Sequence, residues 1–420
     1  MMKSFFVLLM VLGMKTMHKS TFVLFLLSGL LVSCIEEFKI TKSEEAGFEP
    51  NMVIEGHILS GDQSIIYVSQ TVPFGTVEKP ESIINALVTI IGENGYETEK
   101  AEFDIENDRY VIPTHNLPMD TKYALRVEVQ GETYQSEFQN IQRVNQIDEV
   151  CYKETENEVN IYISSYGQKS ESPYYMWTYE EDWEIHPYID VTKEIRGFWK
   201  YDKYFYPELE EANKNGENPY YNCWGKNYSG MIHIYDTSNL SQNSVKDHKL
   251  FSIPIDDNRI SYLYSLLVKQ ARLDENGYKY YHTLKRYTEG SEGLFTPMPT
   301  ELRGNVYCVT NPQIKVLGYV IASQVSTKRI FIDSKDLHNG GIFDGLCNIS
   351  EGSNAKTYKE LMQMAGAWSN EVNINGAFIW TERENEIEAS SLLYSRPCVD
   401  CRVLPYSTQK RPDFWPTDHE

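Results

Sequence analysis

Basic residues are scarce in this 420-residue chain, which holds 39 Lys and Arg against 60 Asp and Glu and carries a formal net charge of −21. Proteins that bind nucleic acid or anionic lipid surfaces rely on clustered Lys and Arg to pair with phosphates. The charge balance therefore disfavours both as partners. A link to a membrane would have to come from a covalent lipid rather than from a basic patch.

Catalytic motifs are also missing. The sequence has no G-x-S-x-G elbow, no H-E-x-x-H pair, no phosphate loop and no dinucleotide glycine fingerprint. Its histidines are scattered, with none at metal-ligand spacing to another. Carboxylates are too numerous for a glycosidase pair to stand out. The densest group near aromatics, Glu180-Glu181-Asp182, is interpreted as a solvated acidic loop. We therefore predict a protein that is not an enzyme and has no cofactor and no metal.

The chain lacks an apolar run long enough to cross a bilayer, which requires about 20 residues. The run from Phe22 to Val32 is shorter, follows Lys19 and ends at Ser33-Cys34. A positive region, an apolar region and small residues in this order are typical of a signal peptide. We predict a signal peptide over residues 1–33, with Met17 as the true start.

The residues Leu31-Val-Ser-Cys34 also resemble the bacterial lipobox, in which the cysteine is acylated and becomes the first residue of the mature chain. Cys34 is accordingly the predicted lipid anchor. The alternative is an ordinary secretory signal in which this cysteine is incidental. The acidic pair Glu36-Glu37 follows, within a short polar tether over residues 34–47.

Cysteines other than Cys34 are expected to form disulfides, because an even number in an exported chain favours them, although six allow 15 pairings. Cys398-Val-Asp-Cys401 could also be read as a redox pair or half of a zinc site. Pro397 and the loop-like tail argue against the helix that a redox pair opens. Zinc would need a second ligand pair, and none exists. The candidate disulfide cysteines are Cys151, Cys223, Cys308, Cys347, Cys398 and Cys401.

Short strands separated by turns are predicted between Asn51 and Gln139. In Lys122–Val129 apolar and polar residues alternate with a period of two, which indicates a sheet with one wet face. Gly131-Glu132 then predicts a tight hairpin. The other predicted strands are Met52–Leu59, Ser64–Gln70, Ala86–Ile91, Tyr96–Phe103, Arg109–Pro113 and Thr133–Phe138. This spacing favours an immunoglobulin-like or transthyretin-like β-sandwich over residues 48–141.

A larger β-rich domain is predicted over residues 142–420, so the expected fold class is mainly β. Short helices are expected at Asp274–Glu289 and Tyr358–Ala365. Residues 190–249 show no clean period and predict an irregular aromatic insertion. The tail from Cys398 to Trp415 is expected to be a loop stapled by cysteines. Strands are expected at Glu158–Ser164, Tyr174–Trp183, Arg259–Leu273, Gly304–Thr310, Ile314–Ser323, Lys328–Asp333 and Gly376–Thr381.

Aromatic residues gather in two places. On the strand Tyr174–Trp183, alternation places Tyr175, Trp177 and Tyr179 on one face. Such a stripe either binds a sugar or a protein partner, or fills the core between two sheets, and the core is the favoured interpretation for this strand. For the insertion a surface role is favoured, because nothing in its pattern requires burial. The candidate ligand or partner contacts are Tyr175, Trp177, Trp183, Trp199, Tyr201 and Tyr204.

Several stretches, taken in their order along the chain, carry a family resemblance. They are Val53-Ile-Glu-Gly56, Asn85-Ala-Leu-Val-Thr-Ile90, Tyr174-Tyr-Met-Trp-Thr-Tyr-Glu-Glu181, Tyr262-Leu-Tyr-Ser-Leu-Leu-Val-Lys-Gln270, Gly304-Asn305, Val316-Leu-Gly-Tyr319, Cys398-Val-Asp-Cys401 and Arg411-Pro-Asp-Phe-Trp415. Together they resemble Bacteroidota outer-membrane lipoproteins of domain-of-unknown-function family 4249. The tail departs from that pattern, with Val403-Leu-Pro-Tyr406 where a glycine-rich segment is expected.

The resemblance implies an exported lipoprotein encoded near TonB-dependent outer-membrane transporters, with no established catalytic residues. An acidic stretch after the lipidated cysteine resembles a signal for surface display, which Glu36 and Glu37 would supply. We expect an outer-membrane, surface-exposed lipoprotein that captures substrate for such a transporter or assists it. The open alternatives are a stand-alone glycan-binding or glycan-cleaving protein and a structural or adhesive surface protein. A glycan or a peptide is the expected kind of ligand.

Overall fold

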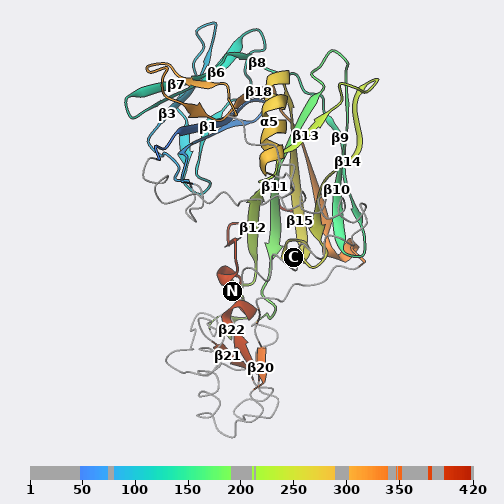
Figure 1. Ribbon diagram of the computed structural model, residues 1–420. Helices are drawn as coiled ribbons and strands as arrows, with labels where there is room; N and C mark the ends of the chain where they lie inside the picture. Colours follow the sequence, from blue (N-terminus) through green and yellow to red (C-terminus); the bar gives the residue numbers. More distant parts are fainter. Residues whose placement is uncertain are drawn as a thin grey trace, which may run out of the picture. The chain divides into compact units, whose positions relative to one another are not determined.

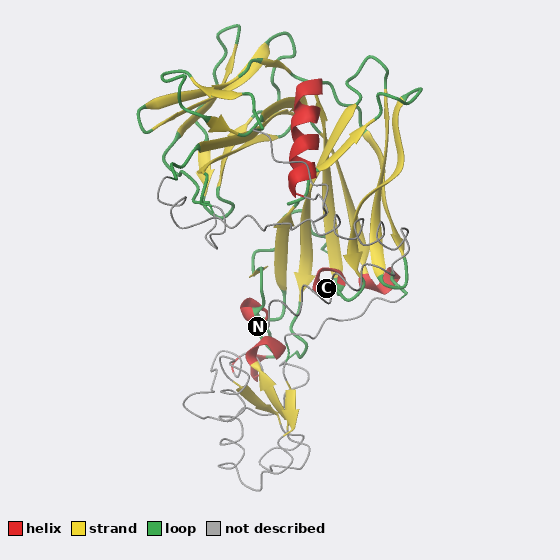
Figure 2. Ribbon diagram, in the orientation of Figure 1, coloured by secondary structure: helices red, strands yellow, loops and turns green. Residues whose placement is uncertain are grey.

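The computed structural model is built mainly of β-strands, which confirms the predicted fold class (Figure 2). It describes residues 48–73, 80–190, 211, 214–288, 302–338, 347, 349–351, 377–380 and 392–417. Cys34, Glu36, Glu37, Trp199, Tyr201, Tyr204 and the helix predicted at 358–365 lie outside the described residues. Among the helices of the described part, none is long and apolar enough to cross a membrane.

The chain divides into two units. The first comprises residues 1–50 and 72–77, and its described residues, 48–50 and 72–73, form no helix or strand. The second comprises residues 51–71 and 78–420 and contains every element described below.

The first β-sandwich packs two sheets around one apolar core. One sheet runs in the order β17-β1-β2-β5-β4, with β18 also paired to β1, and the other runs β16-β7-β6-β3, with β8 also paired to β6. The early strands are β1 (Met52–Ser60), β2 (Gln63–Gln70), β3 (Leu87–Gly92), β4 (Glu102–Asp104), β5 (Arg109–Pro113), β6 (Lys122–Val129), β7 (Glu132–Ser136) and β8 (Gln139–Asn140).

The predicted hairpin joins β6 to β7. Its two connecting residues are Gln130 and Gly131, with φ of 54° and 83°. Two positive φ values give a turn whose twist matches that of the flanking strands. Within β6, Tyr123, Leu125 and Val127 are buried, as the alternation predicts.

Strands from much later in the chain complete this first sandwich. They are β16 (Val306–Cys308), β17 (Val316–Leu317) and β18 (Val320–Gln324). Both β17 and β18 pair with β1 in parallel, and β16 pairs with β7 antiparallel. The side chain of Asn305 clamps the backbone of Val320, accepting from its N–H and donating to its carbonyl at 2.8 Å each. The sequence did not predict this return, because the expected sandwich was one continuous segment.

Predicted and observed strand bounds differ in several places, and two of these differences have a local cause. The strand predicted at Tyr96–Phe103 is limited to Glu102–Asp104, because the preceding residues meet β3 irregularly, where Ile90 donates its N–H to the Thr98 hydroxyl. The strand predicted from Arg259 begins at Leu263. A short 3-10 helix, η1 (Asn258–Ile260), precedes it, and the Asp257 side chain caps that helix by accepting from the N–H of Arg259.

The second β-sandwich packs a three-stranded sheet, in the order β14-β10-β9, against a larger sheet in the order β19-β15-β11-β12-β23, with β13 also paired to β11 (Figure 1). Strands β12, β13 and β14 lie where an irregular insertion was predicted, so that prediction is wrong for residues 223–249. The strands are β9 (Ile147–Glu154), β10 (Glu158–Gly167), β11 (Tyr174–Ile185), β12 (Cys223–Tyr228), β13 (His233–Asp236), β14 (Asn243–Pro254), β15 (Leu263–Leu273), β19 (Ser326–Asp333) and β23 (Ser407–Thr408).

The first of the two predicted helices is present as α5 (Glu275–Thr288). Figure 1 shows it alongside β11 and β13, where Tyr280 and Tyr281 pack against Met176 of β11 and Ile321 of β18. The central strands β11 and β15 are therefore covered on both faces. The remaining elements are η2 (Ser334–Asp336), η3 (Arg396–Cys398), η4 (Cys401–Val403) and a small sheet of β20 (Ile349–Glu351), β22 (Leu392–Ser395) and β21 (Ala377–Trp380).

Three charged residues form ion pairs that join the sandwiches near His57. Lys269 of β15 contacts the Asp62 carboxylate at 2.6 Å and the Glu180 carboxylate at 2.9 Å. His57 of β1 lies with Lys269 at the wall of a cavity of about 10 Å³. Burial, and then the charge of Lys269, lower the pKa of His57 from 6.5 to about 4. The imidazole is therefore neutral in the folded protein at neutral pH.

We expect the fold to lose stability through His57 as the pH falls from about 6.5 to about 4. In this window the unfolded chain binds a proton at His57 that the folded chain excludes, so stability falls as the pH falls, by about 3 kcal/mol. Urea unfolding of wild type and His57→Gln at several pH values measures the effect, since the difference between them isolates His57 from the carboxylates. Parallel pH curves for the two proteins would contradict it.

Candidate functional site

The aromatic stripe of β11 is core rather than binding surface. Tyr175 and Trp177 are 0% exposed and Trp183 is 2% exposed, and all three belong to the core between the two sheets. Trp177 Nε1 donates to the Gln270 side chain at 2.9 Å, and the Tyr175 hydroxyl donates to the Asn243 carbonyl at 2.6 Å. The prediction that these three residues contact a ligand or a partner is therefore wrong, and the core interpretation holds.

The carboxylates Glu180, Glu181 and Asp182 are not a solvated acidic loop, so that interpretation is wrong. They lie in the middle of β11, where Glu181 accepts from Arg259 at 2.6 Å and from the Tyr264 hydroxyl at 2.7 Å. Burial raises the pKa of Asp182, which pairs with Arg329 at 3.4 Å. Because each carboxylate has a cationic partner, this group stabilises the sheet and offers no free acid–base pair.

Four of the predicted cysteines form two disulfides, Cys223–Cys401 and Cys347–Cys398. Each cysteine of the C-x-x-C motif thus pairs with a partner far away in sequence. Cys151 and Cys308 are free thiols, which corrects their prediction as disulfide cysteines. The first disulfide fixes the tail to β12 beside the end of β11, because Cys223 pairs there with Ile185, and such a cross-link typically stabilises by about 2–4 kcal/mol.

The tail predicted as a stapled loop is held by polar contacts as well. Asp400 is fully buried, and its carboxylate accepts from Arg396 and Arg402, which lowers its pKa against the opposing effect of burial. Trp415 is buried, and its Nε1 donates to the Glu184 carboxylate at 2.8 Å. The tail is therefore a fixed part of the second sandwich at this end.

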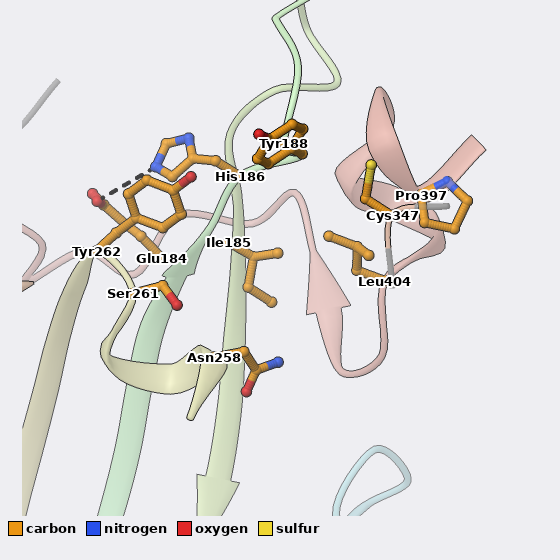
Figure 3. Close-up of a pocket in the computed structure, with 10 residues that line it drawn as sticks. All are labelled: Glu184, Ile185, His186, Tyr188, Asn258, Ser261, Tyr262, Cys347, Pro397 and Leu404. Carbon is orange, nitrogen blue, oxygen red and sulfur yellow. Dashed lines mark ion pairs between the residues drawn. The ribbon is translucent and has the colours of Figure 1, made fainter. Parts of the chain in front are cut away.

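A small pocket of about 40 Å³ lies where the tail meets β11 and β15 (Figure 3). Glu184 is the second-last residue of β11 and His186 follows two positions later, so both side chains leave the chain on the same face. Tyr262 directly precedes β15. Figure 3 shows its ring packed beside His186, with Tyr188 on the other side of the opening. The lining residues are Glu184, Ile185, His186, Tyr188, Asn258, Ser261, Tyr262, Cys347, Pro397 and Leu404.

The polar groups of this pocket are only partly paired. His186 Nε2 lies 3.6 Å from the Glu184 carboxylate, while His186 Nδ1 is buried with no hydrogen-bond partner. The Tyr262 ring packs against the imidazole with a centroid distance of 4.2 Å, and the Tyr221 ring with one of 4.7 Å. Burial, followed by the nearby Tyr221 and Glu184, raises the pKa of Tyr262. The phenol therefore stays protonated and can donate or accept a hydrogen bond.

Two other cavities are wider and more open. One of about 660 Å³ lies between the segments that cross from one sandwich to the other and is lined by neutral polar and apolar residues together with His115 and Lys328. Within the part of the chain that the structure describes, no cluster of His, Cys, Asp or Glu could hold a metal ion. The pocket at His186 is thus the site where a buried carboxylate, a bare imidazole nitrogen and a phenol come together.

Sequence reasoning missed this pocket. Its one local signal is Glu184-Ile-His186, where an acid and a histidine alternate at the end of a strand. Tyr262 and the tail residue Leu404 are distant in sequence, and tertiary contacts such as the antiparallel pairing of β11 with β15 and the disulfides bring them close. The insertion residues Trp199, Tyr201 and Tyr204, predicted as contacts, lie outside the described residues.

Fold and pocket together define a β-sandwich protein with a small polar pocket at one disulfide-linked end. The sequence profile of a family described as a domain of unknown function (DUF4249) matches residues 35–329. Since this match covers more than half of the chain, the chain belongs to the DUF4249 family, as the resemblance predicted.

Two further comparisons add little. A search of curated proteins found no match. Among the solved structures that match, a two-domain fibronectin type-III segment of chicken tenascin is 10% identical to this chain. The match covers 53% of this chain and 90% of that one, with a TM-score of 0.15. A TM-score this low carries no argument about fold or function.

Proposed function

We propose that this protein is a lipoprotein of the outer membrane, displayed on the cell surface, that acts without catalysis as an accessory or substrate-capture partner of a TonB-dependent transporter. The observation that carries the proposal most is the lipobox-like Leu31-Val-Ser-Cys34 in a chain that belongs to this family. An acyl chain on Cys34 would attach the acidic protein to a membrane surface that its negative charge would not attract.

The disulfides support export. Structural disulfides persist in oxidising compartments and are rare in the cytosol, and the described residues form two. The absence of a catalytic motif from the sequence, with the acids of β11 held in ion pairs, supports a role in binding rather than in catalysis.

Purification of a tagged protein from detergent-solubilised outer membranes tests the partnership. We expect a TonB-dependent transporter to co-purify, and Cys34→Ala to release the protein from the membrane fraction and to lose the transporter. Protease treatment of intact cells should remove the protein if it faces outward. Recovery of the tagged protein alone from crosslinked cells would argue against the partnership.

The stand-alone glycan-binding alternative has lost one of its two predicted aromatic platforms, because the one on β11 is buried in the core. The other, at Trp199, Tyr201 and Tyr204, lies outside the described residues and gives no observation that favours this alternative. We therefore do not propose it as a second function.

A further inference from the structure

At the pocket beside His186, two hydrogen-bond acceptors, His186 Nδ1 and the Tyr262 hydroxyl, have no hydrogen-bond partner among the described residues. Glu184 is only 5% exposed and places its carboxylate beside His186 Nε2. A proton kept on Nε2, where the carboxylate stabilises it, leaves Nδ1 as a bare acceptor. The Tyr262 hydroxyl has no hydrogen-bond partner among the described residues, and Figure 3 shows it pointing toward the pocket opening at Tyr188.

The lining suits a small cation. The described residues that line it include a carboxylate and no Lys or Arg, so none of them repels positive charge. The aromatic rings of Tyr188 and Tyr262 flank the space, and a cation is attracted to such faces, especially when it is partly desolvated. Tyr188 is 48% exposed, so the pocket can be reached from solvent.

The volume of the pocket also limits the size of the group that it can bind. One water needs about 10–15 Å³ of such volume, and this pocket offers about 40 Å³. A sugar ring is too large for it, whereas an ammonium group with its first methylene fits. The net charge of −21 on the whole chain also favours cationic ligands over anionic ones.

We propose that this pocket binds a primary ammonium group, either the end of a lysine side chain or a free alkylamine. The ammonium N–H groups would donate to His186 Nδ1 and to the Tyr262 hydroxyl, with the Glu184 carboxylate close by to balance the charge. The inference rests on the substrate-capture role proposed above and names the chemical class that would be captured.

Isothermal titration of the purified mature chain with n-butylammonium chloride tests the inference. We expect saturable binding, and binding at least about tenfold weaker for n-butanol, which lacks the charge, and for tetramethylammonium, which lacks N–H donors. Titration with Nα-acetyl-lysine methylamide separates the two sources, because tighter binding than n-butylammonium would indicate a peptide lysine. Equal binding of n-butanol and n-butylammonium would overturn the proposal.

Variants locate the binding at this pocket. Tyr262→Phe removes one acceptor and keeps the ring, so it should weaken n-butylammonium binding about tenfold. Tyr406→Phe is the matched control, because Tyr406 is 77% exposed and does not line the pocket, and it should bind as wild type does. His186→Phe, which removes both ring nitrogens, is a second test should Tyr262→Phe fold poorly. Unchanged affinity in a folded variant of either pocket residue would overturn the assignment.

These measurements need no membrane, so their outcome is independent of the transporter experiment. A transporter that co-purifies with a chain that binds no alkylammonium would refute the ammonium site alone. Alkylammonium binding by a chain that recovers no transporter would refute the partnership alone.

Discussion

Gly304→Ala should prevent the first sandwich from forming correctly. A Cβ at this position would lie 1.5 Å from the carbonyl oxygen of Gly318 and 2.7 Å from its carbonyl carbon. Both contacts are with backbone, so no side chain can rotate away. Gly318 in turn has φ of +104° and lies against the Ile54 carbonyl of β1, which leaves the Gly318 segment no room to retreat. We expect a loss of about 4 kcal/mol or more, or a failure to fold.

Urea unfolding followed by circular dichroism measures this loss, or soluble yield where the variant does not fold. Gly230→Ala is the control, because a Cβ there meets no atom within 4 Å and its φ is ordinary. We expect that control to stay within about 0.5 kcal/mol of wild type. A Gly304→Ala protein as stable as the Gly230→Ala protein would show that the two glycine segments do not pack in this way.

These glycines also show what local patterns can and cannot predict. Gly304-Asn305 and Val316-Leu-Gly-Tyr319 stood out in the sequence only through a family resemblance. The reason for these residues lies in the tertiary structure. Gly318 lies between two strands that pair in parallel with β1, and the Asn305 side chain binds the backbone of Val320. Parallel pairing between distant segments leaves no signature in either segment alone, so the return of the chain to the first sandwich could not be predicted.

Individual strands were easier to predict, because apolar and polar residues alternate with a period of two in each strand that has one face in solvent. This holds for Lys122–Val129, whose alternation matches its burial. Alternation does not match burial in β11, because α5 covers the second face of this strand and the charged residues Glu181 and Asp182 are buried as well. A run of charged residues is interpreted as solvated unless its partners are known. Here the partners are Arg259 of η1 and Arg329 of β19, which are distant from β11 in the sequence.

The pocket escaped prediction for a related reason. Its polar groups belong to common residue types. Whether such a group is available to a ligand depends on which neighbouring residues form hydrogen bonds with it. That His186 Nδ1 is left without a partner follows from the positions of Tyr262, Tyr221 and the tail. None of these positions can be read from the spacing of residues near His186.

Trp177→Ala should destabilise the second sandwich strongly and thereby separate a core role from a binding role for the β11 aromatics. The indole is 0% exposed and packs against the rings of Tyr175 and His248, with centroid distances of 5.4 and 5.3 Å. Removing a buried Trp side chain costs about 3–5 kcal/mol. The Gln270 carbonyl, which accepts from Nε1, would also lose its partner in a site where Gln270 itself is fully buried.

The free energy of unfolding from urea titration measures this effect, and Tyr166→Ala on β10 is the matched control. Tyr166 is also an aromatic residue of the second sandwich, but it is 55% exposed, so its removal should cost about 0.5 kcal/mol or less. A binding role would give the opposite pattern, because a ligand contact can be removed with little effect on folding. If Trp177→Ala were as stable as Tyr166→Ala, the aromatic stripe would have to face solvent, and the two sheets could not pack as they do around Tyr175, Trp177 and Trp183.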